Sequence, residues 1–338
     1  SALIANTIGD RNTALGWSAM ATNVDGDRNV AIGYGAMQTF EPANTATYNT
    51  AVGYVAGNAM TTAINNTFIG GLANAVGVPG NQNTAVGSQA MYNNADVENT
   101  GIGYAALNAN TSGGYNTAVG SNVMSANTTG DSNVAVGMNA LDANTTASNN
   151  VAIGAAALGA NTTGTNNVMV GNSAGDAITT SNNNTGVGHD VLGANTSGDT
   201  NTAMGSTALN TNTTGSNNVA LGFGALTANT SAPDNVAVGT ASLYVNTTGA
   251  SNVAVGSNAL QQNTTAGNNT AVGVNALKNN TTGTLNVAVG KDALNFNTTG
   301  DDCTAVGLDA LYANTTAHDN TAVGSRALDA YDNVYHWC

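Results

Sequence analysis

Charged and aromatic side chains are scarce in this sequence, and their scarcity excludes an ordinary globular core. Charged residues make up 7% of the chain and aromatic residues 5%, whereas an average soluble domain has about 25% charged residues. Val, Ile and Thr are nevertheless frequent and regularly placed, and disordered chains are poor in β-branched residues. We therefore expect an ordered structure that buries small side chains in many thin layers.

Basic residues are few, which argues against negatively charged partners. Five basic residues stand against 19 acidic ones, so the formal net charge is −14. Nucleic acids and anionic membrane surfaces both require basic patches, so neither is an expected partner. No apolar run approaches the roughly 18 residues of a membrane-spanning helix, and no signal peptide is visible. We expect no membrane insertion by this segment.

Reactive side chains are few and scattered. The two cysteines, Cys303 and Cys338, lack the spacing of a metal site, and they are interpreted either as free thiols or as a bridge between chains. The histidines, His189, His318 and His336, lie far apart in the sequence. Catalysis needs different groups to converge, whereas this chain repeats the same groups. We therefore expect no enzyme activity, no metal and no cofactor.

The sequence is an array of short repeats with the unit N-[T/V]-A-[V/I/L]-G-x-x-A-L-x-x-N-T-T-G-x-x. From Gly103 to Gly324 the central glycines, here called corner glycines, are 17 residues apart; earlier spacings include one of 20 and one of 16. The corner glycines are residues 16, 33, 53, 70, 87, 103, 120, 137, 154, 171, 188, 205, 222, 239, 256, 273, 290, 307 and 324. We predict a lead-in over 1–11, a repeat array over 12–328 and a C-terminal cap or junction over 329–338.

The repeat length and composition predict an all-β fold, a parallel β-solenoid (β-roll) of about nineteen 17-residue coils. A 17-residue unit is too short for a helical hairpin, and frequent Gly and Asn disfavour helices. N-V-A-V-G predicts a short strand, the glycine a corner with positive φ, x-x-A-L a second short strand, and N-T-T-G-x-x the return. Coils about 4.8 Å apart would extend the array on the order of 90 Å.

An asparagine stands four residues before each corner glycine, with Cys303 as the single exception. In stacked coils such side chains form a ladder in which each amide donates to one neighbour and accepts from the other. We call this set the pre-strand Asn column. Its predicted ladder includes Asn116, Asn133, Asn150, Asn252, Asn269 and Asn286.

Alternation along the strand places the alanine and its two neighbours on opposite faces. We expect Val253 and Val255 to face the coil interior, together with Leu260 from the second strand. Ala254 then faces outward, and a small apolar column there would allow close packing against neighbouring chains around a common axis. An alanine that is merely tolerated at the surface is the alternative.

A second asparagine column, the turn Asn column, opens the N-T-T turns. One interpretation is structural, with Asn and Thr capping the turn and stacking in ladders; the other is N-glycosylation, because each Asn begins an N-x-[S/T] sequon. Thr columns on a flat face would also suit ice binding, although adjacent threonines point to opposite sides and leave at most one outward column. The turn Asn column consists of Asn110, Asn127, Asn144, Asn161, Asn195, Asn212, Asn229, Asn246, Asn263, Asn280, Asn297 and Asn314.

Four aromatic residues directly follow a corner glycine in the first six coils: Trp17, Tyr34, Tyr54 and Tyr104. An aromatic stripe of this kind can contact glycans by stacking on sugar faces, and capping of the array is the alternative interpretation. The irregular segment from Gln38 to Tyr48 is a further candidate for recognition, because loops on a rigid scaffold often carry specificity.

The N-x-A-[V/I]-G-x-x-A pattern over residues 12 to 328 resembles the head repeats of trimeric autotransporter adhesins (YadA-like). The longer N-T-A-V-G-x-x-A-L-x-x-N-T-T-G unit is similar to repeats of phage tail fibres and of large secreted bacterial surface proteins. The resemblance implies a left-handed parallel β-roll in a homotrimeric fibre, located outside the cell on a cell or virion surface. The 17-residue period is longer than that of the adhesin heads.

Three functions are compatible with these features. The leading hypothesis is an extracellular structural fibre or adhesin shaft, a stiff element that presents or forms a cell-surface attachment. The alternatives are a phage tail-fibre shaft that binds a glycan receptor and an ice-binding solenoid. The expected partners are further copies of the chain, in a homotrimer or filament, and surface glycans.

Overall fold

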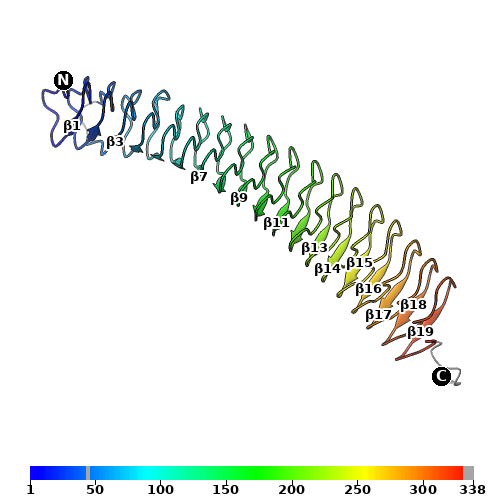
Figure 1. The fold of residues 1–338 in the computed structure, drawn as a ribbon. Helices are drawn as coiled ribbons and strands as arrows, with labels where there is room; N and C mark the ends of the chain where they lie inside the picture. Colours follow the sequence, from blue (N-terminus) through cyan, green and yellow to red (C-terminus); the bar gives the residue numbers. More distant parts are fainter. Residues whose placement is uncertain (43–45, 330–338) are drawn as a thin grey trace. The chain divides into compact units, whose positions relative to one another are not determined.

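The computed structural model describes residues 1–42 and 46–329, and it is all-β over these residues, with no helix among them (Figure 1). The chain divides into an N-terminal unit, Ser1–Val168, and a C-terminal unit, Met169–Cys338. Each unit is a stack of coils with one three-residue strand per coil.

In the N-terminal unit the strands are β1 (Thr13–Leu15), β2 (Val30–Ile32), β3 (Thr50–Val52), β4 (Thr67–Ile69), β5 (Thr84–Val86), β6 (Thr100–Ile102), β7 (Thr117–Val119), β8 (Val134–Val136) and β9 (Val151–Ile153). The boundary between the units falls inside β10 (Val168–Val170). In the C-terminal unit the strands are β11 (Thr185–Val187), β12 (Thr202–Met204), β13 (Val219–Leu221), β14 (Val236–Val238), β15 (Val253–Val255), β16 (Thr270–Val272), β17 (Val287–Val289), β18 (Thr304–Val306) and β19 (Thr321–Val323).

Successive strands pair in parallel, and each residue lies over its counterpart in the next coil. The irregular spacings do not disturb this register. Val30 pairs with Thr50 across the 20-residue step, and Thr84 pairs with Thr100 across the 16-residue step. The turns therefore absorb the length changes, and the parallel β-solenoid predicted from the repeat is confirmed.

The middle residue of each strand, which is alanine in most coils, faces the coil interior, so the predicted orientation of the strand was wrong. Ala254 is fully buried, whereas Val253 and Val255 are partly exposed. Side chains do alternate between the two faces of the strand, but the buried and exposed faces are exchanged relative to the prediction. The physical reason is the small cross-section of a 17-residue coil, in which the strand lies close to the turn opposite and leaves room for only one small side chain per strand.

Size compensation across the coil supports this account of the interior. Where Phe68 replaces the strand alanine, the opposite turn carries Gly57, on which a Cβ would lie 2.9 Å from the Phe68 ring. Where Met169 replaces it, the turn of the same coil carries Gly175, and a Cβ there would lie 3.1 Å from the methionine sulfur. A larger side chain on one wall is thus matched by glycine on the other, as close packing requires.

The x-x-A-L segment is a turn and not the second strand predicted from the sequence. Asn258 and Leu260 both adopt left-handed φ values, +58° and +50°. These conformations bend the chain so that Ala259 and Leu260 are both fully buried. The Leu260 N–H donates to the carbonyl of Ala276 in the next coil at 3.0 Å, so the turn continues the bonding between coils without a strand.

The corner glycines adopt φ values from +128° to +144°, a region almost closed to residues with a Cβ. Close approach between coils adds a second constraint. A Cβ on Gly256 would lie 2.4 Å from the carbonyl oxygen of Gly273 in the next coil. The positive φ predicted at the corner is confirmed, and the close approach of the next coil is a second reason for glycine.

We predict that Gly256→Ala lowers the free energy of unfolding of the C-terminal unit by about 3 kcal/mol, because backbone strain and a clash with backbone act together. Gly71→Ala is the control, since Gly71 has no positive φ and open space around its Cβ position. Urea denaturation followed by circular dichroism measures both. Equal, small effects of the two substitutions would contradict the role assigned to the corner glycine.

Leu285 occupies a left-handed turn position at which other coils carry polar residues. Its φ is +61° and its side chain is 53% exposed, whereas Asn268 holds the same position one coil earlier with the same φ. Asn tolerates this conformation better than Leu, so Leu285→Asn is expected to raise the free energy of unfolding by about 0.5–1 kcal/mol. The reverse change, Asn268→Leu, should lower it by a similar amount. A loss of stability in Leu285→Asn would refute the assignment.

Candidate functional site

Groups suited to catalysis or metal binding do not converge in the part of the chain that the structure describes. No cluster of three or more His, Cys, Asp or Glu residues there could hold a metal ion. Nor do the described residues include a helix suited to crossing a bilayer. His189 and His318 lie in separate coils, and His336 lies outside the described residues. The features that remain are repeated columns: two inside the coils and three on the surface.

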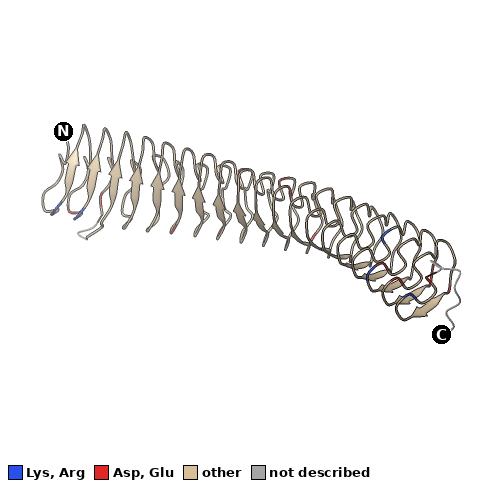
Figure 2. Ribbon diagram, turned by 60° about the horizontal axis from the view of Figure 1, so that its bottom comes forward, with Lys and Arg blue, Asp and Glu red and all other residues tan. Residues whose placement is uncertain are grey.

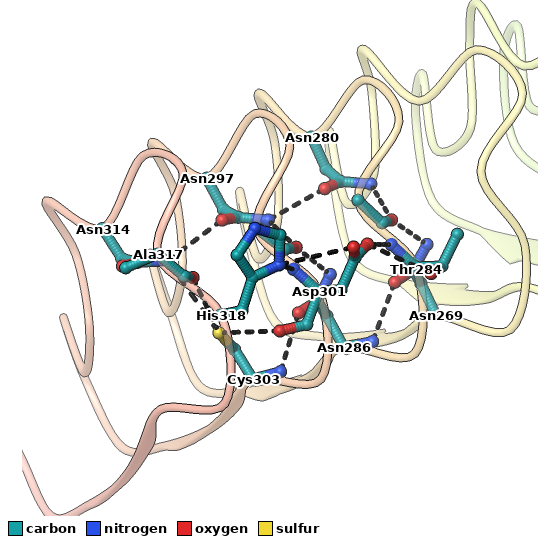
Figure 3. Close-up of polar contacts among 12 residues, drawn as sticks. Asn269, Asn280, Thr284, Asn286, Asn297, Asp301, Cys303, Asn314, Ala317 and His318 are labelled. Carbon is teal, nitrogen blue, oxygen red and sulfur yellow. Dashed lines mark hydrogen bonds and ion pairs between the residues drawn. The ribbon is translucent and has the colours of Figure 1, made fainter.

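The pre-strand Asn column is buried and joins each coil to the next through backbone groups. The Asn252 Oδ1 accepts the backbone N–H of Asn269 at 3.0 Å. In the next coil the Asn269 Oδ1 accepts the backbone N–H of Asn286 at 2.9 Å (Figure 3). Asn252 Nδ2 donates to the carbonyl of Ala266 at 2.9 Å. Each side chain therefore binds mainly backbone, whereas the sequence suggested amide-to-amide bonds. In the N-terminal unit Asn116, Asn133 and Asn150 accept in the same way.

Cys303 takes the place of an asparagine in this column. Its backbone N–H still donates to the Asn286 Oδ1 at 2.9 Å, and its thiol lies 3.3 Å from the carbonyl oxygen of Ala317 (Figure 3). The thiol is buried and free, and burial raises its pKa. A buried thiol with a raised pKa is a poor site for a bridge between chains. Cys338 lies outside the described residues.

The turn Asn column forms a second buried ladder, and this one runs from amide to amide. Asn280 Nδ2 donates to the Asn263 Oδ1 at 2.9 Å and to the carbonyl of Gly283 at 2.8 Å. In the N-terminal unit Asn127 Nδ2 donates to the Asn110 Oδ1 at 2.8 Å. All members are fully buried except Asn314, which is partly exposed. The nitrogen that would carry a glycan is thus enclosed and hydrogen-bonded, so the geometry favours the structural interpretation over glycosylation.

The two threonines of the turn differ in their surroundings. The Thr281 hydroxyl donates to the carbonyl of Thr298 in the next coil at 2.9 Å, whereas Thr282 is exposed. One column of hydroxyls faces outward at this turn, in agreement with the argument from adjacent threonines. A single column is narrow for an ice-binding face.

The outer sheet face consists of the first and third residues of the strand in each coil. The first is Val or Thr and the third is Val, Ile, Leu or Met, and no strand carries a charged residue. The side chains are partly exposed, for example Val272 and Val289 at 37% each. Acidic and basic residues lie on the turns. In Figure 2 the strands of each unit are tan, the colour of uncharged residues. An acidic protein thus presents an uncharged, β-branched surface.

Three of the four predicted aromatic residues form a continuous stack. These three residues and Tyr104 are here called the aromatic column. Trp17 and Tyr34 have ring centroids 4.9 Å apart at 17°, and Tyr34 and Tyr54 lie 5.5 Å apart at 20°. Tyr104 holds the same position but is separated from Tyr54 by two coils. The rings of Trp17, Tyr54 and Tyr104 remain more than half exposed. Both faces of Tyr34 are covered by its neighbours, which limits where a sugar could stack.

A cation–π contact in the N-terminal unit was not predicted. The Arg28 guanidinium lies 5.3 Å from the centroid of the Tyr48 ring and also donates to the Tyr48 hydroxyl. Both residues precede a corner glycine by five positions, and that shared position is the sequence signal that would have revealed the pair. Part of the segment from Gln38 to Tyr48 lies outside the described residues.

Carboxylates on the turns act locally and do not form a shared site. Burial raises the pKa of Asp142, and burial together with the nearby Asp190 raises the pKa of Asp176. The backbone N–H of Thr284, 2.6 Å away, is the main reason that the pKa of Asp301 is lowered. Asp301 therefore caps the backbone of the preceding coil.

Comparison with protein-family models and with curated proteins finds no match for this chain. Its function therefore has to be inferred from the columns described above.

We predict that Cys303→Asn raises the free energy of unfolding of the C-terminal unit by about 1 kcal/mol, because the amide restores a strong donor and an acceptor to a buried ladder position. Urea denaturation measures the change. The matched control is Asn286→Cys one coil earlier, which should destabilise the unit by a similar or larger amount. If both variants changed stability in the same direction, the ladder would not account for the column.

Proposed function

We propose that the chain is an extracellular structural fibre or adhesin shaft that presents an attachment element and works as an assembly of several copies. The observation that carries this proposal is the strand pairing from coil to coil within each unit, which the asparagine ladders reinforce. Strand pairing, the pre-strand Asn column and the turn Asn column all join neighbouring coils. A stack held at three places in its cross-section resists bending and stretching, which is the property a shaft requires.

Repetition supports a mechanical role over a chemical one. The same side chains recur at the same positions from coil to coil, whereas catalysis requires different groups at one place. The absence of enzyme activity remains a prediction. The proposed location on a cell or virion surface rests on the resemblance of the N-x-A-V-G array to adhesin heads and tail-fibre repeats.

The outer sheet face is proposed as the surface through which copies associate. With the strand alanine buried, Val253 and Val255 take the outward position that the sequence had assigned to Ala254. Copies with a net charge of −14 repel one another, and an uncharged face is where that repulsion is weakest.

The size of the outer sheet face is adequate for such an interface. Three residues per coil at strand spacing cover about 50 Å², so the nine or so coils of one unit present roughly 450 Å². The faces of the two units sum to about 900 Å² per chain, which a trimer would divide between two neighbours at about 450 Å² each, at the low end of specific interfaces. We propose a homotrimer, with this face directed toward the common axis.

Lysine substitutions on the outer sheet face test the association. Val238→Lys, Val255→Lys and Val272→Lys together place charges at three partly exposed positions in successive coils. We expect the unaltered chain to sediment as a trimer of the 33.3 kDa protomer and the triple variant to sediment as a monomer. Sedimentation equilibrium measures the mass.

The matched control is Thr248→Lys, Thr265→Lys and Thr282→Lys, which adds the same charge to the exposed turns of the same region. This variant should remain a trimer. A monomeric unaltered chain, or equal dissociation of both triple variants, would contradict the proposed interface.

A further inference from the structure

The aromatic column is interrupted, and the interruption leaves ring faces open. Tyr34 is sandwiched between Trp17 and Tyr54, so neither of its faces is free. Beyond Tyr54, the next two coils carry Gly71 and Ser88 at the position that the rings hold. Nothing lies within 4 Å of the point where a Cβ on Gly71 would be. The face of Tyr54 that points away from Tyr34 therefore borders open space.

Tyr104 bounds the same space from the other side. It stands three coils after Tyr54 in the N-terminal unit, which corresponds to about 14 Å at strand spacing. The floor between the two rings is formed by Gly71 and by the exposed Ser88. We call this gap the aromatic notch. A ring stacked on an aromatic face lies about 4.5 Å or more from it, so the notch has room for a ring stacked on each tyrosine.

Polar groups at the notch are neutral and unused. Neither the Tyr54 nor the Tyr104 hydroxyl makes a hydrogen bond within the described residues, and the Ser88 hydroxyl likewise has no partner there. No charged residue occupies this position in any coil of the N-terminal unit. A ligand with apolar ring faces can stack on the tyrosine rings, and its hydroxyl groups can hydrogen-bond to the neutral hydroxyls beside them. A charged ligand would have no residue of opposite charge in this column.

We propose that the aromatic notch between Tyr54 and Tyr104 binds a neutral saccharide, with one sugar ring stacked on the exposed face of Tyr54 and another on Tyr104. Ser88 and the two phenolic hydroxyls bond to sugar hydroxyls. The site lies at the open end of the ring stack, and Trp17 and Tyr34 act by holding Tyr54 in place. This proposal does not depend on the self-association of the outer sheet face.

The test uses the full chain and three neutral trisaccharides, maltotriose, cellotriose and N,N′,N″-triacetylchitotriose. Binding is measured by isothermal titration and by saturation-transfer NMR. We expect at least one trisaccharide to bind, with saturation transfer from tyrosine ring protons. Failure of all three to bind would overturn the proposal.

Two variants change the notch in opposite ways. Gly71→Tyr fills it by extending the ring stack over the exposed face of Tyr54, and the open space at Gly71 allows the substitution. Tyr54→Ala removes the ring. Each is expected to weaken binding about tenfold or more, the scale of one lost aromatic stack. Because both positions are at the surface, circular dichroism should show the fold unchanged.

The control is Tyr115→Ala, which removes a tyrosine that is 58% exposed in the same unit but outside the aromatic column. Its affinity should equal that of the unaltered chain. Equal affinity of Gly71→Tyr and the unaltered chain, or an equal loss in Tyr115→Ala, would place the binding elsewhere and overturn the assignment. Neither result would bear on the proposed shaft function, which is tested by sedimentation.

Discussion

The hydrogen bond from a backbone N–H of one coil to an asparagine Oδ1 of the preceding coil is the interaction on which the other features depend. Asn252 and Asn269 show it in the C-terminal unit, and Asn116 and Asn133 in the N-terminal unit. The bond forms only when coils lie in register, and a buried amide left without it would be costly. Register in turn places glycine over glycine at the corners and ring over ring in the aromatic column.

The sequence predicted the solenoid, the corner glycines and the stacking of asparagines, because a fixed period translates directly into columns. It did not predict which strand face is buried. Alternation gives only the relative directions of Ala254 and Val255, and the width of the coil interior decides between them. A sequence signal for the correct phase did exist. Met169 replaces the strand alanine in the coil where Gly175 replaces the leucine, and Phe68 replaces it in the coil that follows the one in which Gly57 replaces the leucine.

Burial also separates side chains that the sequence alone treats alike. The residues of the turn Asn column match the glycosylation motif in sequence. The side-chain amides of Asn263 and Asn280, however, are buried inside the coil and hydrogen-bond to each other there. The aromatic residues were found by their common position, yet stacking covers both faces of Tyr34. Which faces remain accessible depends on the coils that lack a ring, above all the one that carries Gly71. The ring faces that remain accessible therefore lie where the repeat of aromatic residues is interrupted.

The most direct measurement is an experimental density map of the C-terminal unit at a resolution that shows side-chain amides. The ladder predicts Asn252, Asn269 and Asn286 one above another inside the coils, with each Oδ1 about 3.0 Å from the backbone nitrogen of the next asparagine in the column. Asparagine side chains that point to solvent, or that are offset by a residue between coils, would contradict it.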